Sequence, residues 1–248
     1  MFSGYYTIAS GLITNQRAIE TIGNNVDNLL TPGFRSERIV KSAFQAELQS
    51  RMDSKGTTVL SASGKGSPIV VVGDSVTQFE PGSVKSTGRE LDIAINGDGF
   101  FVVKGTDGQS YLTRNGAFDV DAEGYLELAG YGRIQGATGD IKVGTSSIDV
   151  TQEGIIRDKQ GNLLGTLSIV EPADENTLQR AANGMFTGGG NTPSTNFEII
   201  QGSLEGSNVD MNNEITNLIA TQRDLQSCAS ALKIIDALDR KSAQIASV

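Results

Sequence analysis

The chain has 248 residues, 38% of them hydrophobic, which is enough for a packed core in one large domain or two small ones. It contains no histidine, which removes the usual general base and the commonest transition-metal ligand, and its net charge of -9 disfavours nucleic acid as a partner. We therefore expect no enzyme, no cofactor and no small-molecule substrate. The only cysteine, Cys228, cannot form an intrachain disulfide and is expected to be a small packing residue.

The N-terminal segment carries a heptad seam in which apolar residues alternate at spacings of three and four. This pattern predicts a helix from about Tyr5 into Asn24 and Asn25, and Pro32 and Gly33 must end it by Thr31. The positions of the seam, interrupted at Gln16 and Gly23, are Phe2, Tyr5, Ala9, Leu12, Gln16, Ile19, Gly23, Val26 and Leu30.

The middle of the chain cannot be helical, because residues 56–206 hold 26 of the 30 glycines. A short second helix is expected between residues 35 and 55, where Ala43, Phe44 and Leu48 have suitable spacings. From Val59 onward, short β-branched runs between Gly, Asp and Asn predict an antiparallel β domain with tight turns. The clearest expected strands are 69–72, 91–95, 100–104, 148–151, 163–170 and 197–200, and residues 172–196 are expected to form a long surface excursion.

The tail is predicted to be one long helix, because neither glycine nor proline occurs after Gly206. Its apolar positions follow the same rhythm until Asp236 and Asp239 break it, as a three-residue stammer would. The seam comprises Ile215, Leu218, Leu225, Ala229 and Leu232, and Ile235, Leu238 and Ile245 resume it out of phase.

Both apolar seams must be buried against another protein surface. Fully burying a large aliphatic side chain gains about 1.5 to 3 kcal/mol, so an exposed seam of eight or nine residues forfeits on the order of 10 kcal/mol. The two terminal helices could pair within one chain or with helices of neighbouring chains, and the pattern leaves both arrangements open.

Three possible ligand sites have simpler interpretations. The segment 119–124 resembles half of an EF-hand loop, but Gly130 stands where the bidentate Glu belongs, so an acidic β-turn is favoured over a calcium site. The cluster Gly97-Asp98-Gly99 could hold a phosphate, but the strand directly after it favours a tight turn. Glu90 and Asp92 could serve glycoside chemistry, yet solvated carboxylates are expected in so acidic a protein.

Four further motifs lie near both ends and in the centre of the chain. The helix 1 segment contains Ala9-Ser10-Gly11-Leu12 and Gln16 and ends in Asn24-Asn25-Val26-Asp27-Asn28, followed by Thr31-Pro32-Gly33-Phe34-Arg35. The others are Leu91-Asp92-Ile93-Ala94-Ile95 leading into Gly97-Asp98-Gly99-Phe100-Phe101, then Gly202-Ser203-Leu204-Glu205-Gly206-Ser207-Asn208-Val209, and finally Gln222-Arg223. In this order they resemble the bacterial flagellar basal-body rod protein family, of the proximal or distal rod type with one central β domain, which is related to hook proteins.

The resemblance implies an α+β fold in which long N- and C-terminal helices pack as a coiled-coil-like core around a central antiparallel, Gly-rich all-β domain. The implied divisions are 1–55 for the N-terminal assembly segment, 56–206 for the β domain and 207–248 for the C-terminal assembly helix. It implies a structural subunit that polymerises helically into the axial drive shaft, which transmits torque from motor to hook. The implied partners are the chain itself, neighbouring rod and hook axial proteins and the flagellar type III export apparatus.

The implied location is the flagellar basal body, outside the cytoplasmic membrane. No basic segment precedes an apolar run at the N-terminus and no stretch of 18 apolar residues occurs, so we expect neither a cleaved Sec signal nor membrane insertion. The alternatives are a hook or other hook-basal-body axial protein and, from another class, a secreted β-domain glycan-binding or enzymatic module with oligomerisation helices. The absence of tryptophan weakens the last of these, because sugar sites usually stack on aromatic faces.

The expected assembly interface combines both seams with the turn motifs. Within it, the side-chain amides of Asn24, Asn25 and Asn28 could fix register between helices, or Asn28 could instead cap the first helix. The expected interface residues are Tyr5, Leu12, Gln16, Ile19, Asn24, Asn25, Val26, Asn28, Pro32, Gly33, Phe34, Ser207, Asn208, Val209, Ile215, Leu218, Ile219, Gln222, Arg223, Leu225, Leu232, Ile235 and Leu238.

Overall fold

The computed structural model describes residues 2–43, 70–181, 184–188 and 190–246. The chain forms two compact units, each built from separate pieces of sequence. Unit 1 contains Met1–Asp27, Glu37–Gln78 and Asp210–Val248, and unit 2 contains Asn28–Ser36 and Phe79–Val209. The chain therefore passes from one unit to the other four times, and the turn after the first helix belongs to the β unit.

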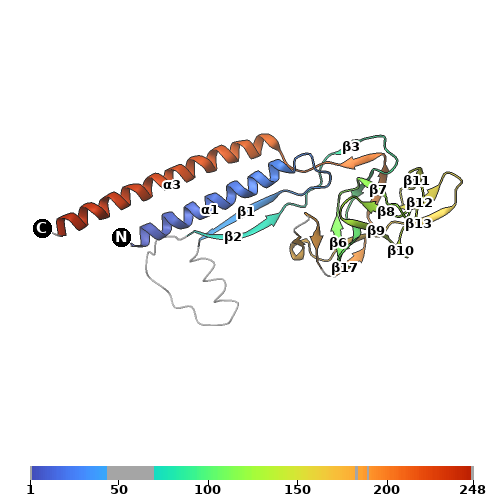
Figure 1. Ribbon diagram of the computed structural model, residues 1–248, viewed down its shortest axis with the longest axis horizontal. Helices are drawn as coiled ribbons and strands as arrows, with labels where there is room; N and C mark the ends of the chain where they lie inside the picture. Colours follow the sequence, from blue (N-terminus) through green and yellow to red (C-terminus); the bar gives the residue numbers. More distant parts are fainter. Residues whose placement is uncertain (1, 44–69, 182–183, 189, 247–248) are drawn as a thin grey trace. The chain divides into compact units, whose positions relative to one another are not determined.

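Unit 1 consists of two long helices and a two-stranded sheet (Figure 1). Helix α1 (Phe2–Asp27) and helix α3 (Met211–Ala246) lie side by side and antiparallel. Strand β1 (Glu37–Ala43) pairs antiparallel with β2 (Val70–Thr77), and both strands contact α1. The predicted terminal helices and their packing against each other are confirmed.

The start of α3 is fixed by a side-chain cap. The carboxylate of Asp210 accepts hydrogen bonds from the backbone N–H groups of Asn212 and Asn213, two of the donors that a helix N-terminus leaves unpaired. Glu214 in the first turn adds a negative charge at the positive end of the helix dipole.

The short helix expected between residues 35 and 55 is wrong where it can be checked, because residues 37–43 form β1. Ile39 is half-buried while its neighbours Arg38 and Val40 are exposed, which is the alternation of a strand. Pairing with β2, more than 25 residues away, decides the conformation, and a local pattern cannot report it. Residues 44–55, where Phe44 and Leu48 lie, and the first residue of the expected strand 69–72 fall outside the described residues.

Unit 2 is an antiparallel β body, as predicted. Its largest sheet runs in the order β15-β16-β6-β5-β9-β8-β7, with β10 on β9 and β14 joining β5 to β17, and the smaller sheets are β11-β12-β13, β18-β4 and β19-β3. Its strands are β3 (Val84–Ser86), β4 (Ile93–Gly97), β5 (Phe100–Gly105), β6 (Ser110–Thr113), β7 (Phe118–Val120), β8 (Leu126–Leu128), β9 (Gly132–Gly136), β10 (Gly139–Asp140), β11 (Ile148–Val150), β12 (Ile155–Asp158), β13 (Leu163–Thr166), β14 (Ile169–Pro172), β15 (Gln179–Arg180), β16 (Phe186–Thr187), β17 (Asn191–Pro193), β18 (Phe197–Gln201) and β19 (Ser203–Glu205), with one 3-10 turn, Glu175–Thr177.

The core of unit 2 is mainly aliphatic, and the rings of Phe101 and Phe118 make an edge contact within it. Its fully covered side chains include Ile93, Phe101, Phe118, Leu126, Ile134, Ile148 and Ile156. A second, smaller cluster brings together Phe79, Phe100 and Phe186, with ring centroids 5.3 to 6.2 Å apart. These rings hold residue 79, at the entry to the unit, against the sheet.

Two strand predictions need correction. Residues 163–170 do not form one strand: β13 pairs with β12, and β14 pairs with β5, so the chain changes sheets between them. The segment 172–196 is not purely a surface excursion, because it contributes three short strands and buries Met185 and Phe186. The physical reason is the aromatic cluster, which needs Phe186 to cover Phe100.

Candidate assembly site

Helix α1 turns its small and polar side, not its apolar seam, to the rest of unit 1. The buried residues of the helix are Thr14, Asn15, Ala18, Ile22 and Asn25. A Cβ added to Gly11 would lie 3.7 Å from the Sγ atom of Cys228, so this face allows α1 and α3 to approach closely. The seam is only partly covered: Tyr5 is half exposed, and so are Tyr6 and Ile13, which lie next to seam positions.

Helix α3 carries two stripes. The stripe facing α1 is half-buried and keeps the heptad spacing through Glu214, Leu218, Thr221, Leu225, Cys228, Leu232 and Ile235. Cys228 is thus a packing residue, as predicted. The helix also exposes aliphatic side chains away from that half-buried stripe: Ile215 and Ile219 near its start, and Ile234, Leu238 and Ile245 near its end, the last of them 79% exposed. We call these five residues the second stripe.

The turn after α1 packs against other segments of unit 2. We call residues 31–36 the strap; four consecutive residues of it, Gly33 to Ser36, are buried. The N–H of Gly33 donates to the carbonyl of Glu205 at 2.8 Å, and the N–H of Ser36 donates to Oδ1 of Asn208 at 2.7 Å. The Arg180 guanidinium donates to the carbonyl of Arg35 and lies 4.7 Å from the centre of the Phe34 ring.

Gly33 is required at its position. Its φ is +67°, and an added Cβ would lie 2.3 Å from the backbone carbon of Arg114. Only glycine combines this backbone conformation with so close an approach. The Thr-Pro-Gly-Phe turn and the Thr113-Arg114-Asn115 turn are therefore packed backbone against backbone.

Glu205 is the centre of a buried ionic cluster. Its carboxylate lies 2.6 Å from Nη1 of Arg35 and 3.4 Å from Nη1 of Arg114, and it accepts the N–H of Gly82 at 3.0 Å. The three charged side chains are each at most 7% exposed. We call this set, Arg35, Arg114 and Glu205, the junction cluster.

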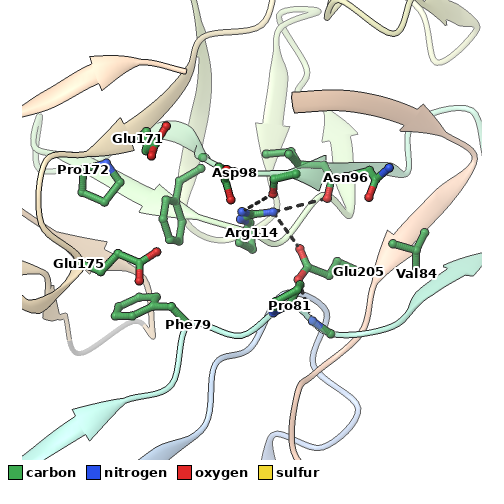
Figure 2. A pocket seen from close by; sticks show the side chains of 15 residues that line it. Phe79, Pro81, Val84, Asn96, Asp98, Arg114, Glu171, Pro172, Glu175 and Glu205 are labelled. Atoms are coloured by element: carbon green, nitrogen blue, oxygen red, sulfur yellow. Dashed lines mark hydrogen bonds and ion pairs between the residues drawn. The ribbon is translucent and has the colours of Figure 1, made fainter. Parts of the chain in front are cut away.

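Two cations share one carboxylate in the junction cluster, and carbonyl groups supply further acceptors for their Nη atoms. The buried Nε atoms of Arg35 and Arg114 have no hydrogen-bond partner among the described residues. Arg114 donates to the carbonyls of Ile95 and Gly97, and Figure 2 shows its guanidinium between the turn that carries Asp98 and the Glu205 carboxylate. Burial lowers the pKa of the Arg114 guanidinium, and the attraction of Glu205 opposes that shift. The guanidinium forms one wall of a cleft of about 410 Å³ lined also by Phe79, Pro172 and Glu175.

Two asparagines of the motifs act as backbone clamps. Asn25 accepts the N–H of Glu37 and donates to the carbonyl of Glu37 and to a carboxylate oxygen of Glu214, which joins α1, β1 and α3. Asn208 accepts the N–H of Ser36 and donates to the carbonyl of Glu80 in unit 2. Each clamp ties together segments that are remote in the sequence.

The three possible ligand sites named from the sequence are turns or carboxylates bonded within the chain. Asp121 accepts backbone N–H groups of Glu123 and Tyr125 and a hydrogen bond from Arg133, so the acidic segment is a turn between β7 and β8. Gly97 and Gly99 both have positive φ in the turn between β4 and β5. The Glu90 carboxylate accepts hydrogen bonds from Ser147 and Lys159, and Asp92 accepts one from Thr87. Glu90 is partly exposed, but Asp92 is buried at 4% exposure, so the expectation that both carboxylates are solvated is wrong for Asp92.

The expected interface residues fall into three groups. Asn25, Gly33, Phe34 and Val209 are buried within the chain. Leu12, Ile19, Val26, Asn28, Pro32, Ser207, Asn208, Leu218, Leu225, Leu232 and Ile235 are half-buried. The exposed ones are Tyr5, Gln16, Asn24, Ile215, Ile219, Gln222, Arg223 and Leu238.

The residues of the junction cluster are absent from the list of expected interface residues. Arg35 and Glu205 lie inside motifs that were singled out, and Arg114 lies in the Thr-Arg-Asn-Gly turn. The sequence signal that could have indicated this cluster is that three motif positions carry charges, two positive and one negative. No spacing in the sequence indicates that residues 170 apart meet.

These features define a class of protein: a subunit whose two terminal helices pair and expose a further apolar stripe, and whose β body is closed by turns adjoining those helices. Comparison with protein families agrees along the chain. Residues 6–35 match the flagella basal body rod protein model, residues 94–185 the flagellar hook protein FlgE/F/G D1 domain, and residues 200–245 the flagellar basal body rod FlgEFG protein C-terminal region. The Arg35–Glu205 ion pair thus joins the first and last matched regions.

Relatives align over nearly the whole length. The chain is 31% identical to the flagellar basal-body rod protein FlgF of Caulobacter vibrioides, over 98% of both chains. It is 29% identical to the rod protein FlgG of Agrobacterium fabrum, over 87% of this chain and 88% of the relative, and 29% identical to FlgG of Bacillus subtilis, over 95% and 96%.

This chain belongs to the flagellar basal-body rod protein family, as its motifs predicted. Membership gives it a structural role in the rod. No helix among the described residues is long and apolar enough to cross a bilayer.

Proposed function

We propose that this chain polymerises helically into the rod through its terminal helices, which pack against those of neighbouring copies and other axial proteins. The observation that carries the proposal is the second stripe of α3, formed by Ile215, Ile219, Ile234, Leu238 and Ile245. Pairing with α1 uses a different side of the helix, so the intrachain contact leaves this stripe available.

The energetics favour an intermolecular cover. Burying a large aliphatic side chain gains up to about 1.5 to 3 kcal/mol, and less where the side chain is already partly covered. Ile234, which is 62% exposed, and Ile245 retain most of that gain for association. Repeated along one helix, several modest gains make a filament contact that a dilute monomer lacks.

Charge supports placing this contact at the ends of the chain. Residues 51–206 contain 12 Lys and Arg against 20 Asp and Glu, so β units of neighbouring copies repel one another at short range. The terminal segments are nearly neutral by the same count. Heterologous contacts between such ends generate an open helical filament when the rotation from one copy to the next does not close a ring.

We further propose that the subunit is not an enzyme, that it transmits torque along the axis, and that the flagellar export apparatus carries it across the cytoplasmic membrane without a cleaved signal. The absence of histidine and the involvement of the motif carboxylates in intrachain contacts support a non-catalytic role. The divisions 1–55, 56–206 and 207–248 remain predictions about which segments drive assembly.

The test places aspartate in the second stripe. Ile219→Asp and Ile234→Asp should leave the monomer folded, because both side chains are exposed, yet prevent incorporation into basal bodies and abolish motility. Lys233→Asp introduces the same side chain at the exposed position next to Ile234 and should preserve assembly. Circular dichroism of the purified chain and electron microscopy of isolated basal bodies measure the two effects. Normal rods from both isoleucine variants would show that another surface drives assembly.

A further inference from the structure

We propose that the strap is a closing device: it docks onto unit 2 only after residues 202–208 have folded into place. The order of docking follows from the contacts inside unit 2. Its consequence for assembly rests on the proposed export route, whereas the order itself does not.

The partners of the strap come from far along the chain. Arg35 donates to the carbonyl of Glu80, which is 45 residues away, and its own carbonyl accepts from Arg180, 145 residues away. The N–H of Ser36 reaches Asn208 across 172 residues. Each contact closes a long loop, so the strap gains little until folding of the β body has brought these partners together.

The charge of Arg35 requires that this residue dock after Glu205. Arg35 is 1% exposed, and a guanidinium that loses its water without a carboxylate partner is strongly disfavoured. Glu205 does not depend on Arg35 in the same way, because the N–H of Gly82 and the guanidinium of Arg114 also hold its carboxylate. Glu205 can therefore be placed first, and Arg35 cannot.

The surface beneath the strap is also built by other segments. Gly33 lies against the backbone of Arg114 and Asn115, in the turn after β6, and Phe34 lies against Arg180 on β15. Both elements belong to the large sheet, which forms without any residue of the strap. The strap is thus added to a finished surface.

The late docking of the strap has a consequence for assembly of the subunit. A chain that becomes available from its N-terminus presents residues 31–36 long before residues 202–208. The segment that continues from α1 stays undocked until nearly the entire chain has emerged. Docking of the strap within unit 2 then reports that the subunit is complete, before its terminal helices join a growing filament.

Pulse-labelling hydrogen exchange during refolding of the full chain tests the order directly. The amides of β5 and β6 report the sheet, Gly202 and Gly206 report the 202–208 segment through bonds to Asp92 and Ser83, and Gly33 and Ser36 report the strap. We expect Gly33 and Ser36 to gain protection about tenfold more slowly than Gly206. Protection of the strap amides before Gly206, or together with it, overturns the proposal.

A pair of arginine variants tests the cause. In Arg35→Met the strap no longer waits for a carboxylate, so the delay between Gly206 and Ser36 should shrink to about twofold or less. Arg38→Met changes an exposed arginine three residues away in β1 and should keep the delay of the wild type. An unchanged delay in Arg35→Met would contradict the charge argument. Because the wild-type order is measured independently, a poorly folding variant does not remove the test.

The outcome is separable from the proposed function. Early docking of the strap would refute the closing device while leaving rod assembly through the α3 stripe intact. Failure of Ile219→Asp and Ile234→Asp to block assembly would refute that contact without affecting the refolding order.

Discussion

The two units differ in which of their characteristic side chains they bury. Unit 2 buries its motif residues: Arg35, Arg114 and Glu205 have almost no exposed surface, and both arginines pair with the Glu205 carboxylate. Unit 1 buries the small and polar side of α1 and leaves Ile219 and Ile234 of α3 exposed. The difference separates residues that complete the subunit from residues that remain available to join subunits.

The comparison also changes the interpretation of the turn motifs. Their position between the seams and the β domain suggested contacts with neighbouring subunits, but Asn25, Phe34 and Asn208 make their contacts inside the chain. These motif residues therefore hold segments of one chain together, and contacts between subunits through the second stripe stay a prediction.

The largest expected effect is at the centre of the junction cluster. Glu205→Gln leaves Arg35 and Arg114 buried without a carboxylate, and breaking a buried ion pair at one partner costs about 3 to 5 kcal/mol. We expect a loss of that size in the free energy of unfolding of unit 2, measured by urea denaturation. Glu198→Gln removes an exposed carboxylate on β18 and should change stability by less than about 0.5 kcal/mol. Equal midpoints for the two variants would mean that the junction cluster contributes little.

Two glycines with nearly the same backbone conformation separate conformational strain from crowding. Gly33 has φ +67° and no room for a Cβ, whereas Gly88 has φ +74° and no atom within 4 Å of a built Cβ. Gly88→Ala should cost about 1 kcal/mol, the penalty of the left-handed conformation alone. Gly33→Ala should cost about 2 to 4 kcal/mol in thermal unfolding, because the backbone must also shift. Similar losses would show that the strap is loosely held.

In unit 1 the matched pair is adjacent in sequence. Asn25→Ala removes three hydrogen bonds that join α1 to β1 and α3, and should destabilise unit 1 by about 1 to 3 kcal/mol. Asn24→Ala alters an exposed side chain and should cost less than about 0.5 kcal/mol. Hydrogen exchange of the α1 amides measures both. A larger effect at Asn24 would place the register-fixing role in the neighbouring residue.

The helices and most strands were predictable because their signals are local. Heptad spacing and the breaker Pro32-Gly33 delimit α1, and β-branched runs between glycines delimit β5 and β11. The exposed stripe of α3 was only partly predicted, since the pattern identifies apolar positions but not which of them meet α1. Ile215 was placed in the seam and lies outside it.

The failures share a physical cause, which is contact at long range. Strand β1 forms because β2 pairs with it, and Phe186 is buried because Phe100 needs a cover. The junction cluster combines residues 35, 114 and 205, and a charged residue in a turn motif looks solvated until its partner is known. Resemblance to a family indicated the importance of the motifs, but only coordinates show that they meet.

The smallest expected effect concerns an exposed ionic turn, which contrasts with the buried junction. Desolvation alone would raise the pKa of the Asp121 carboxyl, but hydrogen bonds from the N–H of Tyr125 and from Arg133 outweigh it and leave the pKa below its ordinary 3.8. A carboxyl with a lowered pKa in the folded state contributes stability above its unfolded value, and that contribution is lost as the pH falls through the folded value. The melting temperature of the wild type should therefore exceed that of Asp121→Asn near neutral pH, and the difference should shrink below pH 3.8. Asp119→Asn, which removes an equally charged but 57% exposed side chain two residues away, serves as the control. A difference that stays constant down to pH 2 would mean that Asp121 acts through the shape of the turn and not through its charge.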